Sequence, residues 1–189
     1  MENAWKCLTT KHNFILQQGL RDAPPETRSA QFSALQFQPR MVASLVLLGV
    51  ILQSPALFLM LSALLWWSAL LPQWNPFDMI HNRVVGVRPG TVLLGPAPGP
   101  RRFAQGMAGT FSLVIGTLLL LGWGWAAFFF EAFFLSAIAA LMFGHFCLGS
   151  FIYHILHGRA SFAMRTLPWV RNAKSVESSC RDYETCLKQ

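Results

Sequence analysis

The fifteen Lys and Arg residues of this 189-residue chain are absent from two long apolar stretches. None lies between Met41 and Asn82, and none lies between Phe103 and Gly158. Apolar runs of this length are typical of membrane-spanning helices, and basic loops are retained on the cytoplasmic face of a membrane. We therefore expect the cytoplasm to hold the three basic segments, which are the N-terminal segment (Lys6, Lys11, Arg21, Arg28, Arg40), the central connection (Arg83, Arg88, Arg101, Arg102) and the tail (Arg159, Arg165, Arg171, Lys174, Arg181, Lys188).

The composition agrees with a protein buried in lipid. Charged residues make up 12% of the chain, about half the share of roughly 25% that soluble domains carry. The net charge of +7 does not indicate a nucleic-acid partner, because the basic residues flank apolar runs instead of forming a stripe with aromatic residues. Contact with anionic lipid headgroups accounts for them, so the lipid bilayer is the first expected partner.

The first apolar stretch is too long for one upright helix. Met41 to Leu71 would span about 46 Å as a single helix, whereas the hydrocarbon core is about 30 Å thick. Ser54 can cap a helix and Pro55 fits a first helical position. We predict helices at Pro39–Gln53 and Pro55–Leu71, both short. The alternative is one kinked, tilted span, which gives three spans and puts the basic segments on opposite sides.

The second apolar stretch is long enough for two helices. Gly122-Trp123-Gly124-Trp125 supplies a turn with interfacial aromatic residues. This pattern predicts helices at Phe103–Leu121 and Ala126–Leu156. The expected fold is therefore all-α, a polytopic membrane protein with four transmembrane helices in two hairpins and cytoplasmic termini.

The expected organisation has three parts. Residues 1–38 form a cytoplasmic N-terminal segment, which is polar and lacks the apolar core of a signal peptide. Residues 39–157 form the membrane domain, whose Gly/Pro-rich cytoplasmic connection is 83–102, and residues 158–189 form a cytoplasmic tail.

Further local elements are expected outside the spans: a short helix at Thr27–Phe37, an interfacial segment at Trp74–Arg83, a small hairpin around Arg88–Thr91, an amphipathic stretch at Arg159–Leu167 and a helix at Ser175–Lys188.

Glu131 is the only acidic residue well inside an apolar run. A carboxylate at membrane depth is costly, which makes Glu131 a candidate catalytic or proton-handling residue. The structural alternative is that Glu131 lies near the outer interface and accepts a hydrogen bond from a turn residue such as Gln53.

Four side chains near the end of the second stretch are types that bind metal ions. His145, Cys147, His154 and His157 lie within thirteen residues. Their spacing does not bring them to one site on a straight helix, although His154 and His157 share a face, so no metal site is predicted. Interfacial positions explain the histidines, haem or pigment ligation through one histidine stays open, and no cofactor is predicted.

Two motifs resemble a known family of small bacterial membrane proteins, the domain of unknown function 4395. They are P-A-P-G-P-R-R-F-A-Q-G at Pro96–Gly106 and F-C-L-G-S-F-I-Y at Phe146–Tyr153. The first hairpin followed by W-N-P-F-D at Trp74–Asp78 fits more loosely, and the likeness covers roughly Pro39–Leu156. It implies four spans in a bacterial inner membrane and no established activity.

The resemblance also makes Cys147 a candidate catalytic residue. Many members of the family carry Cys-x-x-Cys where this chain has Cys147 and Ser150. Such a pair implies thiol–disulfide or sulfur-transfer chemistry, whereas Ser150 cannot resolve a mixed disulfide. Cys147 would act as a single thiolate or be resolved by Cys180 or Cys186. Against this, a helix running to Leu156 puts Cys147 toward a C-terminus, where the helix dipole disfavours a thiolate.

Three functions follow from these observations. The first is a non-catalytic structural or accessory component that packs with other membrane proteins or with its own copies through faces of small residues. The second is thiol redox or sulfur trafficking through Cys147 with a thioredoxin-like or sulfurtransferase partner, assisted by Glu131 or His145. The third is a transporter or channel, which would need oligomerisation because four short helices line too small a pore.

Overall fold

The protein is helical throughout the part described by the computed structural model, which covers residues 12–20, 25–87 and 91–167. No strand occurs within these residues, so the predicted all-α class is confirmed. After a short helix at residues 12–17 come α2 (Pro25–Leu52), α3 (Pro55–Leu70), the 3-10 helix η1 (Pro72–Trp74), α4 (Pro76–Val84), α5 (Gly99–Leu120), α6 (Gly124–Gly144), α7 (Leu148–Leu156) and α8 (Ala160–Arg165).

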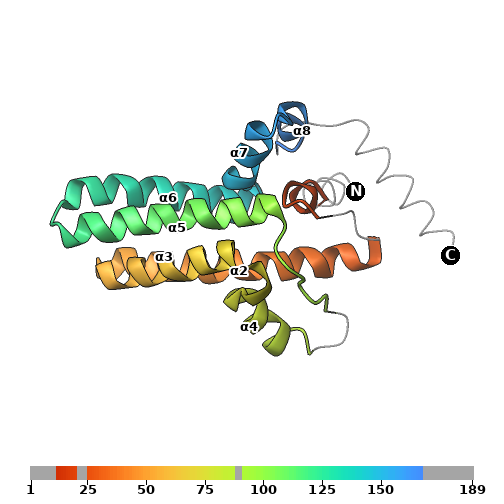
Figure 1. Ribbon diagram of the computed structural model, residues 1–189, viewed down its shortest axis with the longest axis horizontal. Coiled ribbons are helices and arrows are strands. Elements are labelled where there is room, and N and C mark those ends of the chain that lie inside the picture. The colour runs from red at the N-terminus through yellow and green to blue at the C-terminus, as the bar shows by residue number, and fades with distance from the viewer. Residues whose placement is uncertain (1–11, 21–24, 88–90, 168–189) are drawn as a thin grey trace.

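Four long helices lie side by side (Figure 1). α3 packs most extensively against α5, α5 also contacts α6, and α2 contacts both α3 and α6. The tight turns at residues 53–54 and 121–123 lie at one end of this group. The short helices α4, α7 and α8 and the helix at residues 12–17 lie at the opposite end. We call these the turn end and the short-helix end.

Three helices are long and apolar enough to cross a membrane. They are Ser29–Leu52 within α2, Gly99–Leu120 and Gly124–Gly144. α3 is apolar but has 16 residues, which corresponds to about 24 Å. Length and composition alone therefore identify three spans.

The predicted boundaries of α3 and the predicted end of α5 agree with the structure to within one residue, whereas α5 begins at Gly99, four residues before the predicted Phe103. Ser54 is the N-cap of α3, its Oγ accepts a hydrogen bond from the backbone N–H of Leu57 at 3.4 Å, and Pro55 is the first helical residue. The α5–α6 turn falls at Leu121–Trp123, where Gly122 has a φ of +73°. A positive φ is easily adopted by glycine, which explains the Gly-Trp-Gly-Trp turn signal.

The predicted start of the first spanning helix at Pro39 was wrong. α2 runs without a break from Pro25 to Leu52 and has Pro39 in its interior. It joins the predicted segments Thr27–Phe37 and Pro39–Gln53. Proline lacks one N–H donor and disturbs the preceding turn, but buried side chains hold α2 on both sides of it, including Leu35 before and Val42 after.

The prediction of one helix over Ala126–Leu156 was also wrong. α6 ends at Gly144, and His145 adopts the left-handed conformation with a φ of 50°. The backbone N–H groups of His145 and Phe146 both reach the carbonyl of Ala140, as in a left-handed C-cap. Cys147 is extended and starts α7 as a separate helix.

The remaining local predictions have mixed outcomes. The segment Trp74–Arg83, predicted to be interfacial, forms most of α4, and the stretch Arg159–Leu167 contains α8. Most of the predicted hairpin (residues 88–90), the predicted helix Ser175–Lys188 and the cysteines Cys7, Cys180 and Cys186 lie outside the described residues.

The core lies between the four long helices, and the outer surface is apolar as well. Val46, Phe58, Leu61, Leu65 and Ile115 are at most 1% exposed. Large apolar side chains nevertheless cover the outside of the bundle, among them Leu48, Ile51, Leu120, Trp125, Phe128 and Phe129. An extensive exposed apolar surface of this kind suits contact with lipid.

Small residues on α5 bring α3 into close contact. A Cβ atom at Gly109 would lie 2.9 Å from Cδ1 of Trp66, and one at Gly116 would lie 2.9 Å from Cγ of Leu59. The small-residue face of α5 is therefore occupied by packing within the chain.

Candidate functional site

A buried ion pair lies at the short-helix end. Arg101 in the first turn of α5 contacts Asp78 in the first turn of α4, with 2.5 Å between Nη2 and Oδ1. The two side chains are 7% and 8% exposed. The same Arg101 nitrogen donates to Oε1 of Gln38 on α2 at 2.8 Å. Buried charges need such partners, because an isolated one is costly to remove from water.

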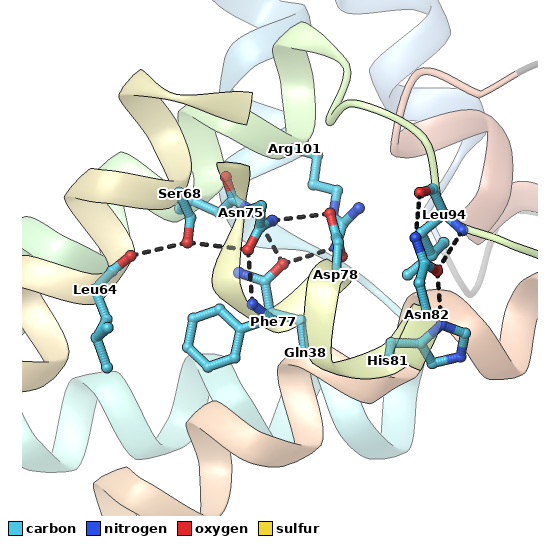
Figure 2. Close-up of polar contacts among 11 residues, drawn as sticks. Gln38, Leu64, Ser68, Asn75, Phe77, Asp78, His81, Asn82, Leu94 and Arg101 are labelled. Atoms are coloured by element: carbon cyan, nitrogen blue, oxygen red, sulfur yellow. Dashed lines mark hydrogen bonds and ion pairs between the residues drawn. The ribbon is translucent and has the colours of Figure 1, made fainter. Parts of the chain in front are cut away.

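Hydrogen bonds extend this pair into a network that joins four helices (Figure 2). Asn75, the N-cap of α4, donates from Nδ2 to Asp78 Oδ2 at 2.9 Å, and its Oδ1 accepts from Ser68 of α3 at 3.1 Å. Gln105 of α5 donates to Gln38 Oε1 at 2.9 Å. We call Gln38, Ser68, Asn75, Asp78, Arg101 and Gln105 the polar network.

Sequence reasoning did not find the polar network. Its signal was present in the quoted motifs, because Asn75 and Asp78 belong to W-N-P-F-D, and Arg101 and Gln105 belong to P-A-P-G-P-R-R-F-A-Q-G. Asp78 near the end of the first stretch and Arg101 just before the second could have been paired, but no local spacing relates the two residues.

Cys147 lies at the N-terminus of a helix, which corrects the expectation of a C-terminal position. It is the N-cap of α7 and is 7% exposed. Its backbone N–H donates to Oε1 of Gln17 at 3.0 Å, so the N-terminal short helix docks on this junction. The helix that contains Cys147 therefore begins at this residue instead of ending near it.

Cys147 and the polar network share a cavity of about 90 Å³ between α2, α5 and α6. Arg101, Gln105 and Gln38 line one part of it, and Ala104 and Leu141 line the part near Cys147. Gln105 is 5% exposed, and its Oε1 has no hydrogen-bond partner among the described residues.

An adjoining apolar cavity of about 120 Å³ shares Cys147, Ala104 and Leu141 with the first. Its remaining walls come from apolar residues of α2, α5 and α6, including Phe111 and Phe134. Cys147 thus lines both a cavity that Gln105 also lines and an adjoining apolar cavity.

Ser150, three residues after Cys147, is also buried. Its exposure is 0%, and its Oγ donates to the carbonyl of Pro100 at 3.4 Å. It lies three residues after the N-cap of α7, within the first helical turn.

The three histidines are not brought together. His154 is buried, and its Nε2 lies 3.1 Å from the carbonyl oxygen of Gln17. His157 is exposed, in contrast to the buried His154, and its ring stacks on Tyr153 at 3.9 Å between ring centroids. His145 packs edge-on against Phe32. Within residues 12–20, 25–87 and 91–167, no three His, Cys, Asp or Glu side chains are grouped to hold a metal ion.

Glu131 is the eighth residue of α6 and is 2% exposed. Gln53 donates to its two carboxylate oxygens at 3.3 and 3.1 Å, the contact expected from the sequence. Gln53 has a φ of 45° in the α2–α3 turn, so the bond ties this turn to α6. Because Cys147 follows the other end of α6, Glu131 does not assist the thiol.

The comparisons with known proteins give one match. A family model described as "Domain of unknown function (DUF4395)" matches residues 32–157. No curated protein and no solved structure matches the chain. The matched range contains the polar network, Cys147 and Ser150.

Proposed function

The chain belongs to the family of the domain of unknown function 4395, and from this premise we propose that it is an integral membrane protein in which α2, α3, α5 and α6 all cross the bilayer. Three of these helices have the length of a span. α3 is shorter, but it packs along α5, and a short hydrophobic helix can be accommodated by local thinning of the bilayer.

The distribution of charge supports an orientation. The turn end carries no Lys or Arg in residues 53–54 or 121–123, whereas Arg83, Arg101, Arg102, Arg159 and Arg165 belong to the segments at the short-helix end. Basic segments stay on the cytoplasmic side. We assign the short-helix end and both termini to the cytoplasm of a bacterium, with the helices in its inner membrane.

Cysteine labelling tests this topology. The four native cysteines are first replaced by Ser. One cysteine is then introduced, either by Trp125→Cys at the turn end or by Val84→Cys at the short-helix end. The side chain of Trp125 is 90% exposed and that of Val84 is 66% exposed. In right-side-out vesicles, a membrane-impermeant maleimide should label position 125 directly and position 84 only after permeabilisation. A three-span protein with the same cytoplasmic N-terminus, in which α2 and α3 form one kinked helix, would give the reverse pattern.

The site favours thiol exchange at Cys147 as the function. The observation that carries it is the position of Cys147 at the N-cap of α7, where it lines a cavity together with Gln105, whose Oε1 has no hydrogen-bond partner among the described residues. A thioredoxin-like protein, a sulfurtransferase or a small thiol on the cytoplasmic side would supply the second sulfur. Neither Gln105 nor Gln17 exchanges sulfur in this scheme. Gln17 holds the backbone of Cys147, and Gln105 lines the cavity next to it, so both are positioning residues.

The chemistry balances as an exchange. The Cys147 thiolate attacks one sulfur of a disulfide, forms a mixed disulfide and releases the other sulfur as a thiolate. A second thiolate then attacks the sulfur bound to Cys147, which leaves as a thiolate again. A persulfide donor would transfer its outer sulfur in the same way and leave as a thiolate. Each step breaks one bond to sulfur and forms another, so no external oxidant is needed.

The test uses Ser150 as well as Cys147. In purified protein whose other three cysteines are Ser, Cys147 should form a mixed disulfide with a small aromatic disulfide, followed by intact mass and by the released chromophore. Cys147→Ser should abolish the release. Ser150→Cys should convert the mixed disulfide into an intramolecular disulfide between Cys147 and the introduced thiol, because both positions lie in one helical turn. The control is the same protein after unfolding, and circular dichroism checks that the tested sample keeps its native helicity. If Cys147 in the folded sample reacts with the disulfide no faster than in the unfolded sample, the proposal is contradicted.

The accessory function is the second candidate. It is favoured by the low exposure of Cys147, at 7%, and by the exposed phenylalanines of α6 (Phe128, Phe129, Phe133). Purification in mild detergent from native membranes, with mass spectrometry of co-eluting proteins, separates the two. A stoichiometric partner retained equally by wild type and Cys147→Ser supports the accessory function, whereas a thioredoxin-like or sulfurtransferase partner lost in Cys147→Ser supports thiol exchange.

A further inference from the structure

A groove of about 470 Å³ runs between α3 and α5 on the outside of the bundle. Its walls are largely apolar and include Trp66 and Leu70 of α3 and Phe103, Met107 and Phe111 of α5. The α5 residues Gly99, Arg102, Phe103, Gly106 and Thr110 also belong to it, which fits spacings of three and four residues on one helical face. Gly106 leaves the groove open because it has no side chain to fill it. A Cβ at this position would point into free space, with Trp66 the nearest neighbour at 3.9 Å.

One end of the groove carries a positive charge. Arg102 is exposed, and its Nε donates to the carbonyl of Ala69 in the last turn of α3 at 2.8 Å. This bond holds the guanidinium at the short-helix end of the groove. Among the described residues, Arg102 forms no ion pair, unlike its neighbour Arg101. Its terminal nitrogens are therefore available to an anion.

The N-terminus of α5 lies at the same end. Gly99 is the first residue of this 22-residue helix, and Pro98 at the N-cap provides no side-chain hydrogen bond. The Tyr153 hydroxyl is close by, 2.7 Å from the position that a Cβ of Gly99 would take. The first-turn N–H groups of a helix attract phosphate, and in α5 these are the groups of Gly99 and Arg101, because Pro100 has none. An arginine guanidinium binds phosphate oxygens through two N–H groups.

We propose that this groove binds an anionic phospholipid of the surrounding bilayer. One acyl chain lies along Leu70, Met107 and Phe111, and the phosphate lies against Arg102 and the N-terminus of α5. Charge complementarity selects the lipid class, because the apolar walls suit any acyl chain whereas the cationic end favours a headgroup with net negative charge. The inference rests on the proposed membrane location, which cysteine labelling tests separately.

Native mass spectrometry of the full chain tests the site, with phosphatidylglycerol and phosphatidylcholine of identical acyl chains as probes. Phosphatidylglycerol should be retained about fivefold more than phosphatidylcholine, the preference expected from one arginine near a membrane surface. Arg102→Gln should remove this preference, and Arg102→Lys should keep part of it. Arg83→Gln, a charge removal at an exposed position of α4, is the matched control.

A second variant tests the apolar part of the groove. Gly106→Leu places a side chain in the open space and should lower the retention of both lipids while the protein stays folded by circular dichroism. Equal retention of the two lipids by the wild type, or equal losses in Arg102→Gln and Arg83→Gln, would overturn the proposal. In the second case, general attraction to the basic surface would account for the binding.

Discussion

Asp78→Ala should lower the free energy of unfolding by about 3–5 kcal/mol, the range for removing one partner of a buried ion pair. Arg101 would keep its charge at a position where its side chain is 7% exposed. Gln38 would remain its hydrogen-bond acceptor, but a neutral oxygen does not balance a buried cation. Asn75 would also lose the acceptor of its Nδ2 group.

Unfolding by SDS titration from mixed micelles measures this effect. Arg83→Ala removes an exposed charge on the same helix and should change stability by no more than about 0.5 kcal/mol. The double variant Asp78→Asn/Arg101→Gln replaces the ion pair by neutral hydrogen-bonding groups and should recover much of the loss. Wild-type stability in Asp78→Ala would show that water or lipid reaches Arg101 and that the pair is not buried in solution.

Gly149→Ala should destabilise the protein by about 1–3 kcal/mol through overpacking. Its Cβ would lie 2.7 Å from both Cα and Cβ of Ala104 on α5. Backbone atoms cannot move aside as the end of a flexible side chain can, so α7 must shift away from α5. Because Cys147 is the N-cap of α7, this shift would also open the cavity next to the thiol.

Gly144→Ala is the matched control, because its Cβ would meet only Phe146 Cβ, at 4.0 Å. Alanine is favoured over glycine within a helix, so this variant should be neutral or stabilising. Thermal unfolding in detergent gives the stabilities, and the rate of Cys147 modification by a small maleimide reports the shift of α7. Equal stability and equal modification rates in the two variants would contradict close α5–α7 packing.

Much of the helical framework could be predicted because local chemistry determines it. Ser54-Pro55 is a capping signal and Gly122 is a turn signal, and both act within one helical turn. Pro39 misled the prediction, since a proline is read as a helix start although tertiary packing can hold it inside a helix. The end of α6 was missed because Gly144 and His145 interrupt a run that stays apolar, so hydropathy gives no sign of the break.

The site was only partly predictable. Cys147 was found from its motif, and the Gln53–Glu131 contact from the cost of a carboxylate in lipid. The cavity next to Cys147 brings together residues from distant parts of the chain, such as Gln38, Arg101 and Leu141, and no local spacing encodes this. The break at His145 was missed, so Cys147 was predicted near the end of a helix although it lies at the start of α7.

The polar network has a consequence for biogenesis. Asp78 follows the first pair of long helices and Arg101 begins the second pair, so neither hairpin contains both charges. A first hairpin that has entered the bilayer alone would carry an unmatched carboxylate, and the second would carry an unmatched guanidinium. Each half therefore depends on the other, and a chain cut within the connection at residues 88–90 should yield two halves that are degraded separately and persist only when made together.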